Sequence, residues 1–258
     1  MEIRRWPLPI FNPTPSSNPR IAMANLTFAW LVHFYTAFGA VVGLYTILAI
    51  DEANFRLAFL LMAVTVIIDA TDGALARAAR VKAIIPWFDG ALLDNLVDYL
   101  NYVIAPTLLM LRARLVPEQD ALWLAALPVL SSAYGFCQRD AKTADHFFLG
   151  FPSYWNIVFF YLYVLQTALW INAFLIIALS ILVFVPMRFI YPSRAPRFRS
   201  QTNILGAIWG ATVLYLIHRL PNPPLWLLLA SLLFPAYYTI LSLWLELRRI
   251  LAQGTSQT

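Results

Sequence analysis

Apolar runs long enough to cross a membrane recur along the whole chain, and short polar segments separate them. The run from 154 to 190 is too long for one crossing, and the segment TALWINA offers a turn near its middle. The pattern therefore predicts an all-α integral membrane protein, a single helical bundle of about eight transmembrane helices. The predicted spans are 28–50, 56–77, 88–111, 120–138, 154–169, 173–190, 203–217 and 224–247.

The composition agrees with a membrane protein. Of the 258 residues, 61% are hydrophobic and only 12% are charged, and the mean hydropathy is +0.69. A soluble domain carries about 25% charged residues. Cys137 is the only cysteine, which excludes an internal disulfide and argues against a cysteine-based metal site. The net charge of +5 is better explained by basic loops on one side of a membrane than by nucleic-acid binding. We therefore expect no nucleic-acid partner.

The distribution of basic residues predicts how the chain is oriented. If the N-terminus lies in the cytosol, fourteen of the eighteen Lys and Arg residues fall on the cytosolic side, which is a strong positive-inside bias. Prolines interrupt the first 26 residues where the apolar core of a signal peptide would lie. We therefore expect a cytosolic lead-in at 1–26, one membrane domain at 27–250 and a tail at 251–258, with both termini cytosolic.

Carboxylates collect on the second and third predicted spans, where an ionisable side chain is costly and is expected to be functional. On the second span, Asp69, Asp72, Gly73 and Ala76 fall within about 100° of arc around the helix. This stripe places two carboxylates beside two residues that are too small to block the approach of a ligand.

The third predicted span carries a matching stripe. Gly90, Asp94 and Asp98 recur every four residues, and Asn101 adds a neutral polar group one turn deeper on the same face. Asp89 lies about 180° away from Asp98 on a helix. We therefore expect Asp89 to begin the helix and to stay outside any ligand set.

Four carboxylates that face one another repel unless cations bind them. Their hard oxygen atoms suit Mg²⁺ or Mn²⁺, and a pair of such ions clamps the attacking and leaving oxygens in a phosphoryl transfer. Arg77 and Arg80, nearer the cytosol, could neutralise the phosphates. The alternative is a set of proton-relay or salt-bridging carboxylates, as in a transporter, but the interleaved glycines exceed what a relay needs.

The segments DATDGALAR (69–77) and GALLDNLVD (90–98) together resemble the signature of the CDP-alcohol phosphotransferase family, with every fixed position present. The spacer between them, residues 78–89, is longer than in most of that family. A longer spacer resembles the bacterial phosphatidylcholine synthase branch, and residues 88–109 and 131–166 are similar to that branch as well.

The resemblance implies a CDP-alcohol phosphotransferase-like bundle that transfers the phosphatidyl group of CDP-diacylglycerol to choline and releases CMP. Two Mn²⁺ or Mg²⁺ ions would be required. The implied metal ligands are Asp69, Asp72, Asp94 and Asp98. Asp98 would also take the proton from the attacking hydroxyl. The residues implied to line the pocket of the CDP moiety are Asp69, Gly73, Ala76, Arg77 and Gly90.

The resemblance further implies a homodimer in the bacterial inner membrane, and the positive-inside bias predicts that the acidic segments, and with them the active site, face the cytosol. Choline is a quaternary ammonium ion, which aromatic faces hold well. The candidates for its site are Tyr102, Tyr134 and Trp155, with Asp140 as an anionic partner. Aromatic residues also gather at membrane interfaces for other reasons.

Three other interpretations remain. A sister enzyme of the same family would use serine, glycerol phosphate or inositol phosphate as the acceptor. A cation-coupled transporter would carry charged residues near the middle of several spans, whereas here they concentrate on two. A scaffold without activity would not need all four aspartates. His33, inside the first span, either faces the nucleotide cavity or is a packed histidine.

Overall fold

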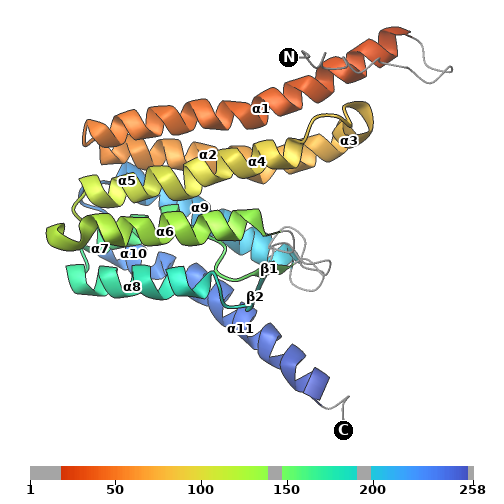
Figure 1. The fold of residues 1–258 in the computed structure, drawn as a ribbon. Helices are drawn as coiled ribbons and strands as arrows, with labels where there is room; N and C mark the ends of the chain where they lie inside the picture. Colours follow the sequence, from red (N-terminus) through yellow and green to blue (C-terminus); the bar gives the residue numbers. More distant parts are fainter. Residues whose placement is uncertain (1–18, 139–146, 191–198, 255–258) are drawn as a thin grey trace, which may run out of the picture.

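The structure, a computed structural model, describes residues 19–138, 147–190 and 199–254. Within these ranges the chain is helical apart from turns and one sheet of two short strands (Figure 1). The N-terminal part consists of α1 (Pro19–Asp51), α2 (Phe55–Ala78), α3 (Val81–Ile84), α4 (Gly90–Tyr99), the π-helical turn η1 (Leu100–Ile104) and α5 (Ala105–Arg112).

The C-terminal part begins with a 3₁₀ turn and contains the two strands. Its elements are η2 (Glu118–Asp120), α6 (Ala121–Cys137), β1 (Phe147–Leu149), α7 (Trp155–Leu165), α8 (Leu169–Leu182), β2 (Arg188–Ile190), α9 (Arg199–His218), α10 (Leu225–Ser231) and α11 (Leu233–Gly254). The strands are antiparallel, with Phe148 paired to Phe189. The prediction of an all-α membrane protein is confirmed, although this small sheet was not foreseen.

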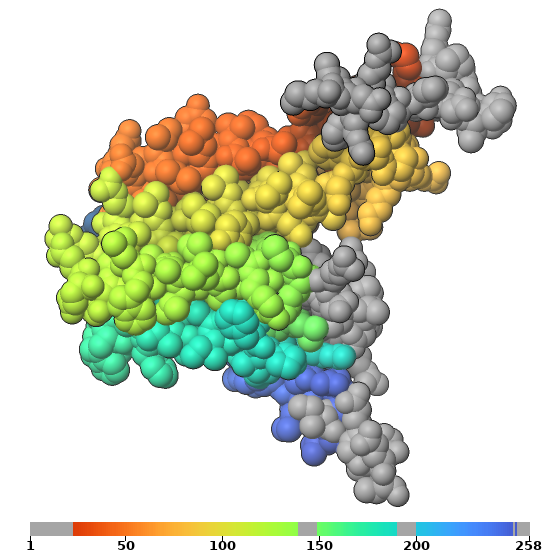
Figure 2. Space-filling view, viewed as in Figure 1, coloured from red at the N-terminus to blue at the C-terminus, as the bar shows by residue number. Residues whose placement is uncertain are grey.

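The helices lie side by side in a bundle. Figure 1 shows α3, β1, β2 and the C-terminal end of α11 toward one end of it. Across the face seen in Figure 2, α1, α4, α6 and α8 follow one another from the orange to the teal part of the chain. Each of these helices is separated from the next in the sequence by at least one other helix.

Four helical segments of the described chain are long and apolar enough to cross a membrane. They are Met23–Asp51, Phe55–Ala78, Glu118–Cys137 and Leu225–Arg249. Large apolar side chains remain exposed on the outer faces, among them Leu122 at 81%, as expected where lipid rather than water surrounds a protein. The multi-pass character is thus supported, and the count of eight crossings stays a prediction.

Some predicted boundaries differ from the structure. α1 begins at Pro19 and not at residue 28, because proline is tolerated in the first turn of a helix and no breaker follows it. The sixth predicted span was placed too late in the sequence, since α8 covers 169–182. Pro186 cannot continue a helix, and the residues after it form β2.

Two glycines let α1 approach the α4–η1 segment closely. A Cβ atom on Gly39 would lie 2.8 Å from Val97 Cγ1, and one on Gly43 would lie 2.5 Å from Asn101 Oδ1. The Asn101 side-chain amide donates hydrogen bonds of 3.0 Å to the carbonyl oxygens of Gly39 and Val97. Small residues and interhelical hydrogen bonds hold transmembrane helices together, so this contact fixes α4 against α1.

The third predicted span is not a continuous α-helix. Residues 100–104 form the π turn η1, and the Ala105 N–H donates to the carbonyl of Leu100. Pro106 has no N–H to donate to the carbonyl of Tyr102 four residues earlier, so a wider turn is tolerated here. Such turns are frequent at functional sites, and this one follows Asp98 within two residues.

Candidate active site

The first acidic stripe lies on the C-terminal half of α2. This helix starts at the N-cap residue Asn54, whose side chain accepts a 3.2 Å hydrogen bond from the Leu57 N–H. Asp69 is partly buried, whereas Asp72 is only 6% exposed. The Thr36 hydroxyl on α1 donates a 2.8 Å hydrogen bond to Asp72 Oδ2, which gives this buried carboxylate a polar partner.

The second stripe begins where α4 begins. Asp89 is the N-cap residue, and its Oδ1 accepts hydrogen bonds from the N–H groups of Ala91 (3.1 Å) and Leu92 (3.0 Å). The prediction that Asp89 starts the helix is confirmed. Its side chain is exposed, whereas Asp94 and Asp98 are partly buried on the face toward α2.

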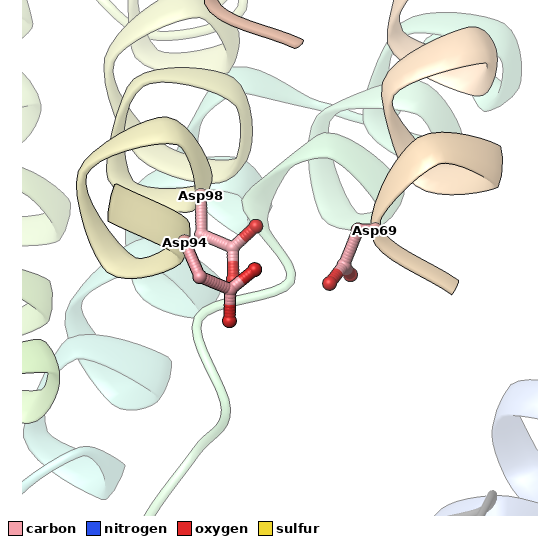
Figure 3. A group of neighbouring side chains, drawn as sticks. All are labelled: Asp69, Asp94 and Asp98. Atoms are coloured by element: carbon pink, nitrogen blue, oxygen red, sulfur yellow. The ribbon is translucent and has the colours of Figure 1, made fainter. Parts of the chain in front are cut away.

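Three carboxylates from the two helices meet. One oxygen atom each from Asp69, Asp94 and Asp98 lies within 4.8 Å of the others. Figure 3 shows the side chains of Asp94 and Asp98 on one helix directed toward Asp69 on the other. A set of three carboxylates this close, all offering oxygen, matches the ligands that Mg²⁺ and Mn²⁺ prefer. These residues therefore fit a divalent cation.

Asp72 lies at the edge of the cluster formed by these three aspartates. It is not among the three carboxylates that converge, but it lines the same small cavity of about 10 Å³. A space of that volume holds about one water molecule. The lining residues are Thr36, Thr65, Ile68, Asp69, Asp72, Asp94, Val97, Asp98, Asn101 and Tyr102.

Tyr102 contacts the aspartate cluster directly. Its hydroxyl donates a 2.7 Å hydrogen bond to Asp69 Oδ2, and the side chain is 7% exposed. The ring centroid lies 6.3 Å from that of Tyr154 at the start of α7. The sequence suggested Tyr102 for choline, whereas the structure shows in addition that its hydroxyl orients Asp69.

The residues predicted to hold the CDP moiety differ in their surroundings. Gly73 and Ala76 are half-buried, and Arg77 is exposed. A Cβ atom on Gly73 would lie 3.4 Å from Arg77 Nη1, so the guanidinium lies beside bare backbone near Asp72. Gly90 differs, because a Cβ there would meet the imidazole of His33 at 2.6 Å.

The other choline candidates do not gather at the cluster. Trp155 is fully buried, its Nε1 donates to Ser132 Oγ (2.9 Å), and its ring packs against Phe151 and Phe159. It therefore presents no ring face to a ligand, because the hydrophobic core covers it. Tyr134 is 47% exposed and lies against Phe184. Asp140 lies outside the described residues.

No protein-family model matches the chain, but curated relatives do. The chain is 41% identical over 223 residues to the phosphatidylcholine synthase of Legionella pneumophila, covering 83% of this chain and 87% of that protein. It is 33% identical over 224 residues to the phosphatidylcholine synthase of Pseudomonas aeruginosa, covering 87% and 94% respectively. The chain belongs to the bacterial phosphatidylcholine synthase family. The resemblance drawn from the two acidic segments is thereby confirmed, as is the prediction of an enzyme.

Sequence reasoning missed two polar side chains on α1 that contact α2 near the acidic stripe. Thr36 binds Asp72, and the hydroxyl of Tyr35 lies 2.8 Å from Thr71 Oγ1 on α2. Two polar residues inside an apolar span were the available signal. The sequence also carried a signal for the close packing at Gly39 and Gly43, since glycines four residues apart mark helix interfaces in membranes.

An apolar groove of about 380 Å³ opens between α2, α7 and α9. It runs along α2 from Phe59 to Ile67 and ends two residues before Asp69. Gly210 on α9 lines it, and a Cβ atom there would meet nothing within 4 Å. The volume lies within the range of about 300–1,000 Å³ that is usual for ligand pockets.

Proposed function

We propose that this protein transfers the phosphatidyl group of CDP-diacylglycerol to choline, giving phosphatidylcholine and CMP. The observation that carries the proposal is the convergence of Asp69, Asp94 and Asp98 from two helices within a membrane bundle. The relatives named phosphatidylcholine synthase match this chain over most of its length, which supports choline as the acceptor.

The reaction needs a base and a stabilised leaving group. The oxygen of the choline hydroxyl attacks the phosphorus that carries the diacylglycerol, and its proton passes to the carboxylate of Asp98. The bond from that phosphorus to the bridging oxygen of the pyrophosphate breaks, and CMP leaves with the electron pair. A positioned base typically accelerates such a step by about 10²–10⁴-fold. The reaction proceeds without a covalent enzyme intermediate.

Asp69, Asp94 and Asp98, with Asp72 beside them, are the residues that would hold two Mn²⁺ or Mg²⁺ ions. When bound, such ions neutralise charge on the phosphoryl oxygens and on the leaving phosphate. The protein's own contribution is orientation: Thr36 holds Asp72 and Tyr102 holds Asp69 by hydrogen bonds of 2.8 and 2.7 Å.

The pyrophosphate of the substrate is proposed to lie along the α2 stripe. Gly73 and Ala76 offer no side chain that would keep phosphates away from the helix, and the Arg77 guanidinium lies beside Gly73. A guanidinium can bind phosphate through two parallel hydrogen bonds. Gly90 completes the predicted CDP pocket, although the imidazole of His33 fills its side-chain position.

The choline ammonium is proposed to contact the ring of Tyr102, which is attached to the same hydroxyl that orients Asp69. Tyr154 lies against that ring and extends the aromatic surface. A cation held on an aromatic face contributes about 0.5–2 kcal/mol, more where it is desolvated. Asp140 remains a candidate for the anionic partner.

The position of the site also suits a substrate that is anchored in the membrane. The apolar groove runs along α2 and ends at Ile67, two residues before Asp69, so one acyl chain could lie in it while the headgroup reaches the carboxylates. We place the enzyme in the bacterial inner membrane as a homodimer, with its active site and both termini on the cytosolic side. The positive-inside distribution supports this orientation, and residues 27–250 form the catalytic domain in this proposal.

The test uses purified protein in detergent with CDP-diacylglycerol, Mn²⁺ and radiolabelled choline. Parallel reactions contain labelled serine, glycerol phosphate or inositol phosphate. We expect lipid-soluble label from choline alone, and its loss when Mn²⁺ is chelated. Label from a different acceptor would overturn the choline assignment, and no transfer from folded protein to any acceptor would overturn the enzymatic function.

A further inference from the structure

Gly90 opens the second acidic segment, yet the space of its missing side chain is already filled. A Cβ atom at Gly90 would lie 2.6 Å from Cε1 and 3.2 Å from Nδ1 of His33 on α1. The shorter distance is roughly 1 Å less than an ordinary carbon–carbon contact. In this structure, therefore, the bare backbone of Gly90 faces the imidazole of His33 and not open space.

The imidazole has little room to move aside. Its ring centroid lies 4.4 Å from that of Phe88 and 5.9 Å from that of Trp30, and only 6% of His33 is exposed. His33 Nε2 has no hydrogen-bond partner among the described residues. The aromatic rings around it, and not a hydrogen bond from Nε2, therefore hold it in place.

These contacts bear on the catalytic helix because α4 begins at Gly90. Asp94 and Asp98 follow at intervals of four residues, about 6 Å of helix each. In this structure one carboxylate oxygen of each lies within 4.8 Å of an oxygen of Asp69. A push at the first turn of α4 would move both carboxylates relative to α2, and an error of about 1 Å in a site can lower the rate about 10²-fold.

We propose that His33 is a positioning residue: its imidazole seats in the hollow at Gly90 and sets where α4 starts, and thereby where Asp94 and Asp98 lie. In this proposal Gly90 is glycine because of His33, and not because the nucleotide needs its bare backbone. The inference rests on the proposed function, which it deepens, and it assigns a structural partner to a residue that was predicted only to line the CDP pocket.

The experiment is a double-mutant comparison of the full-length protein in detergent. Wild type, Gly90→Ala, His33→Ala and the double variant are assayed for choline transfer. The midpoint of thermal unfolding is measured for each with and without Mn²⁺, because a ligand that binds only the folded state raises that midpoint. Asp89→Asn, next in sequence, is the control, since asparagine is an equally good N-cap.

We expect Gly90→Ala to lose about 10²-fold in kcat/KM and most of its Mn²⁺ stabilisation. We expect His33→Ala to lose less, and the double variant to match His33→Ala in both readouts, because alanine at 90 then meets no imidazole. Two close residues coupled in this way show non-additive effects. His33→Ser replaces His33→Ala if the latter is not recovered folded.

The inference would be overturned if Gly90→Ala lowered kcat/KM by the same factor in the wild type and in His33→Ala. That result would mean that the substrate needs the bare backbone of Gly90. A harmless Gly90→Ala would overturn it too. If the wild type transfers nothing to choline, the proposed function fails, while the Mn²⁺ stabilisation of the four proteins still decides the coupling between His33 and Gly90.

Discussion

Tyr102 offers a test that separates its ring from its hydroxyl. Tyr102→Phe keeps the aromatic face proposed to contact choline and removes only the hydroxyl that donates to Asp69 Oδ2 at 2.7 Å. A hydrogen bond to a charged group contributes about 1.5–3 kcal/mol. About 1.4 kcal/mol corresponds to a factor of ten. We therefore expect the orientation of Asp69 that this hydrogen bond stabilises to become about 10- to 100-fold less favoured.

The loss should appear in metal dependence and not in acceptor binding. Partners that orient metal ligands typically change metal affinity or activity about 10- to 100-fold when removed, which agrees with the energy of the hydrogen bond. The assay measures transfer of labelled choline over a range of Mn²⁺ concentrations. We expect the half-saturating Mn²⁺ concentration to rise by that factor while the KM for choline stays unchanged.

A different result would refute this reasoning. An unchanged Mn²⁺ requirement together with a raised KM for choline would mean that the hydroxyl serves the acceptor and not Asp69. Tyr102→Leu provides the matched comparison, because it removes the ring as well and should raise the KM for choline in addition to the Mn²⁺ requirement.

Three further predictions concern residues around the site. Asp89→Asn should leave transfer unchanged, because its Oδ1 caps α4 and asparagine caps equally well; a large loss of activity in folded protein would place Asp89 in the site. A Cβ atom at Gly210 would meet nothing within 4 Å, so Gly210→Leu should place its side chain in the apolar groove. We expect it to raise the KM for long-chain CDP-diacylglycerol a few-fold and to leave the KM for a short-chain substrate unchanged, since lipid tails are as apolar as the groove and only packing is lost. Gly43→Ala should lower stability by about 1–3 kcal/mol through overpacking, because its Cβ would meet Asn101 Oδ1 at 2.5 Å; an unchanged midpoint of thermal unfolding would contradict this.

The acidic stripes were predictable because helix periodicity alone decides which residues share a face. Asp94 and Asp98 are four residues apart, and any regular helix brings them together. The same geometry separates Asp89 from them, and in the structure its side chain caps the start of α4. Membrane helices therefore reveal one part of their chemistry directly in the sequence.

Contacts between helices were harder to predict. The sequence does not state which face of α1 meets α2 or α4, so Thr36 could not be paired with Asp72, nor His33 with Gly90. The π turn after Asp98 changes the phase of the helix, and periodicity cannot foresee it. Trp155 is a further example, since the sequence does not show that this aromatic residue at the start of α7 is fully buried.

The boundaries of the spans followed apolar composition, which does not distinguish membrane helix from buried strand. The apolar residues around Pro186 extended a predicted span that in fact ends at Leu182. At the other extreme, the helix suggested near residues 21–26 proved to be continuous with the first span, since α1 begins at Pro19. Hydropathy finds the centre of a span well, whereas caps and breakers decide its ends.

The central claim is that the carboxylates shared by α2 and α4 carry out phosphatidyl transfer to choline, and Asp98→Asn tests it most directly. The measurement is labelled choline incorporation by this variant at saturating Mn²⁺, with Mn²⁺-dependent binding of CDP-diacylglycerol measured on the same preparation. We predict that transfer is abolished while most of the binding is retained, because the amide can still offer an oxygen but cannot take the proton. Turnover close to that of the wild type would contradict the account.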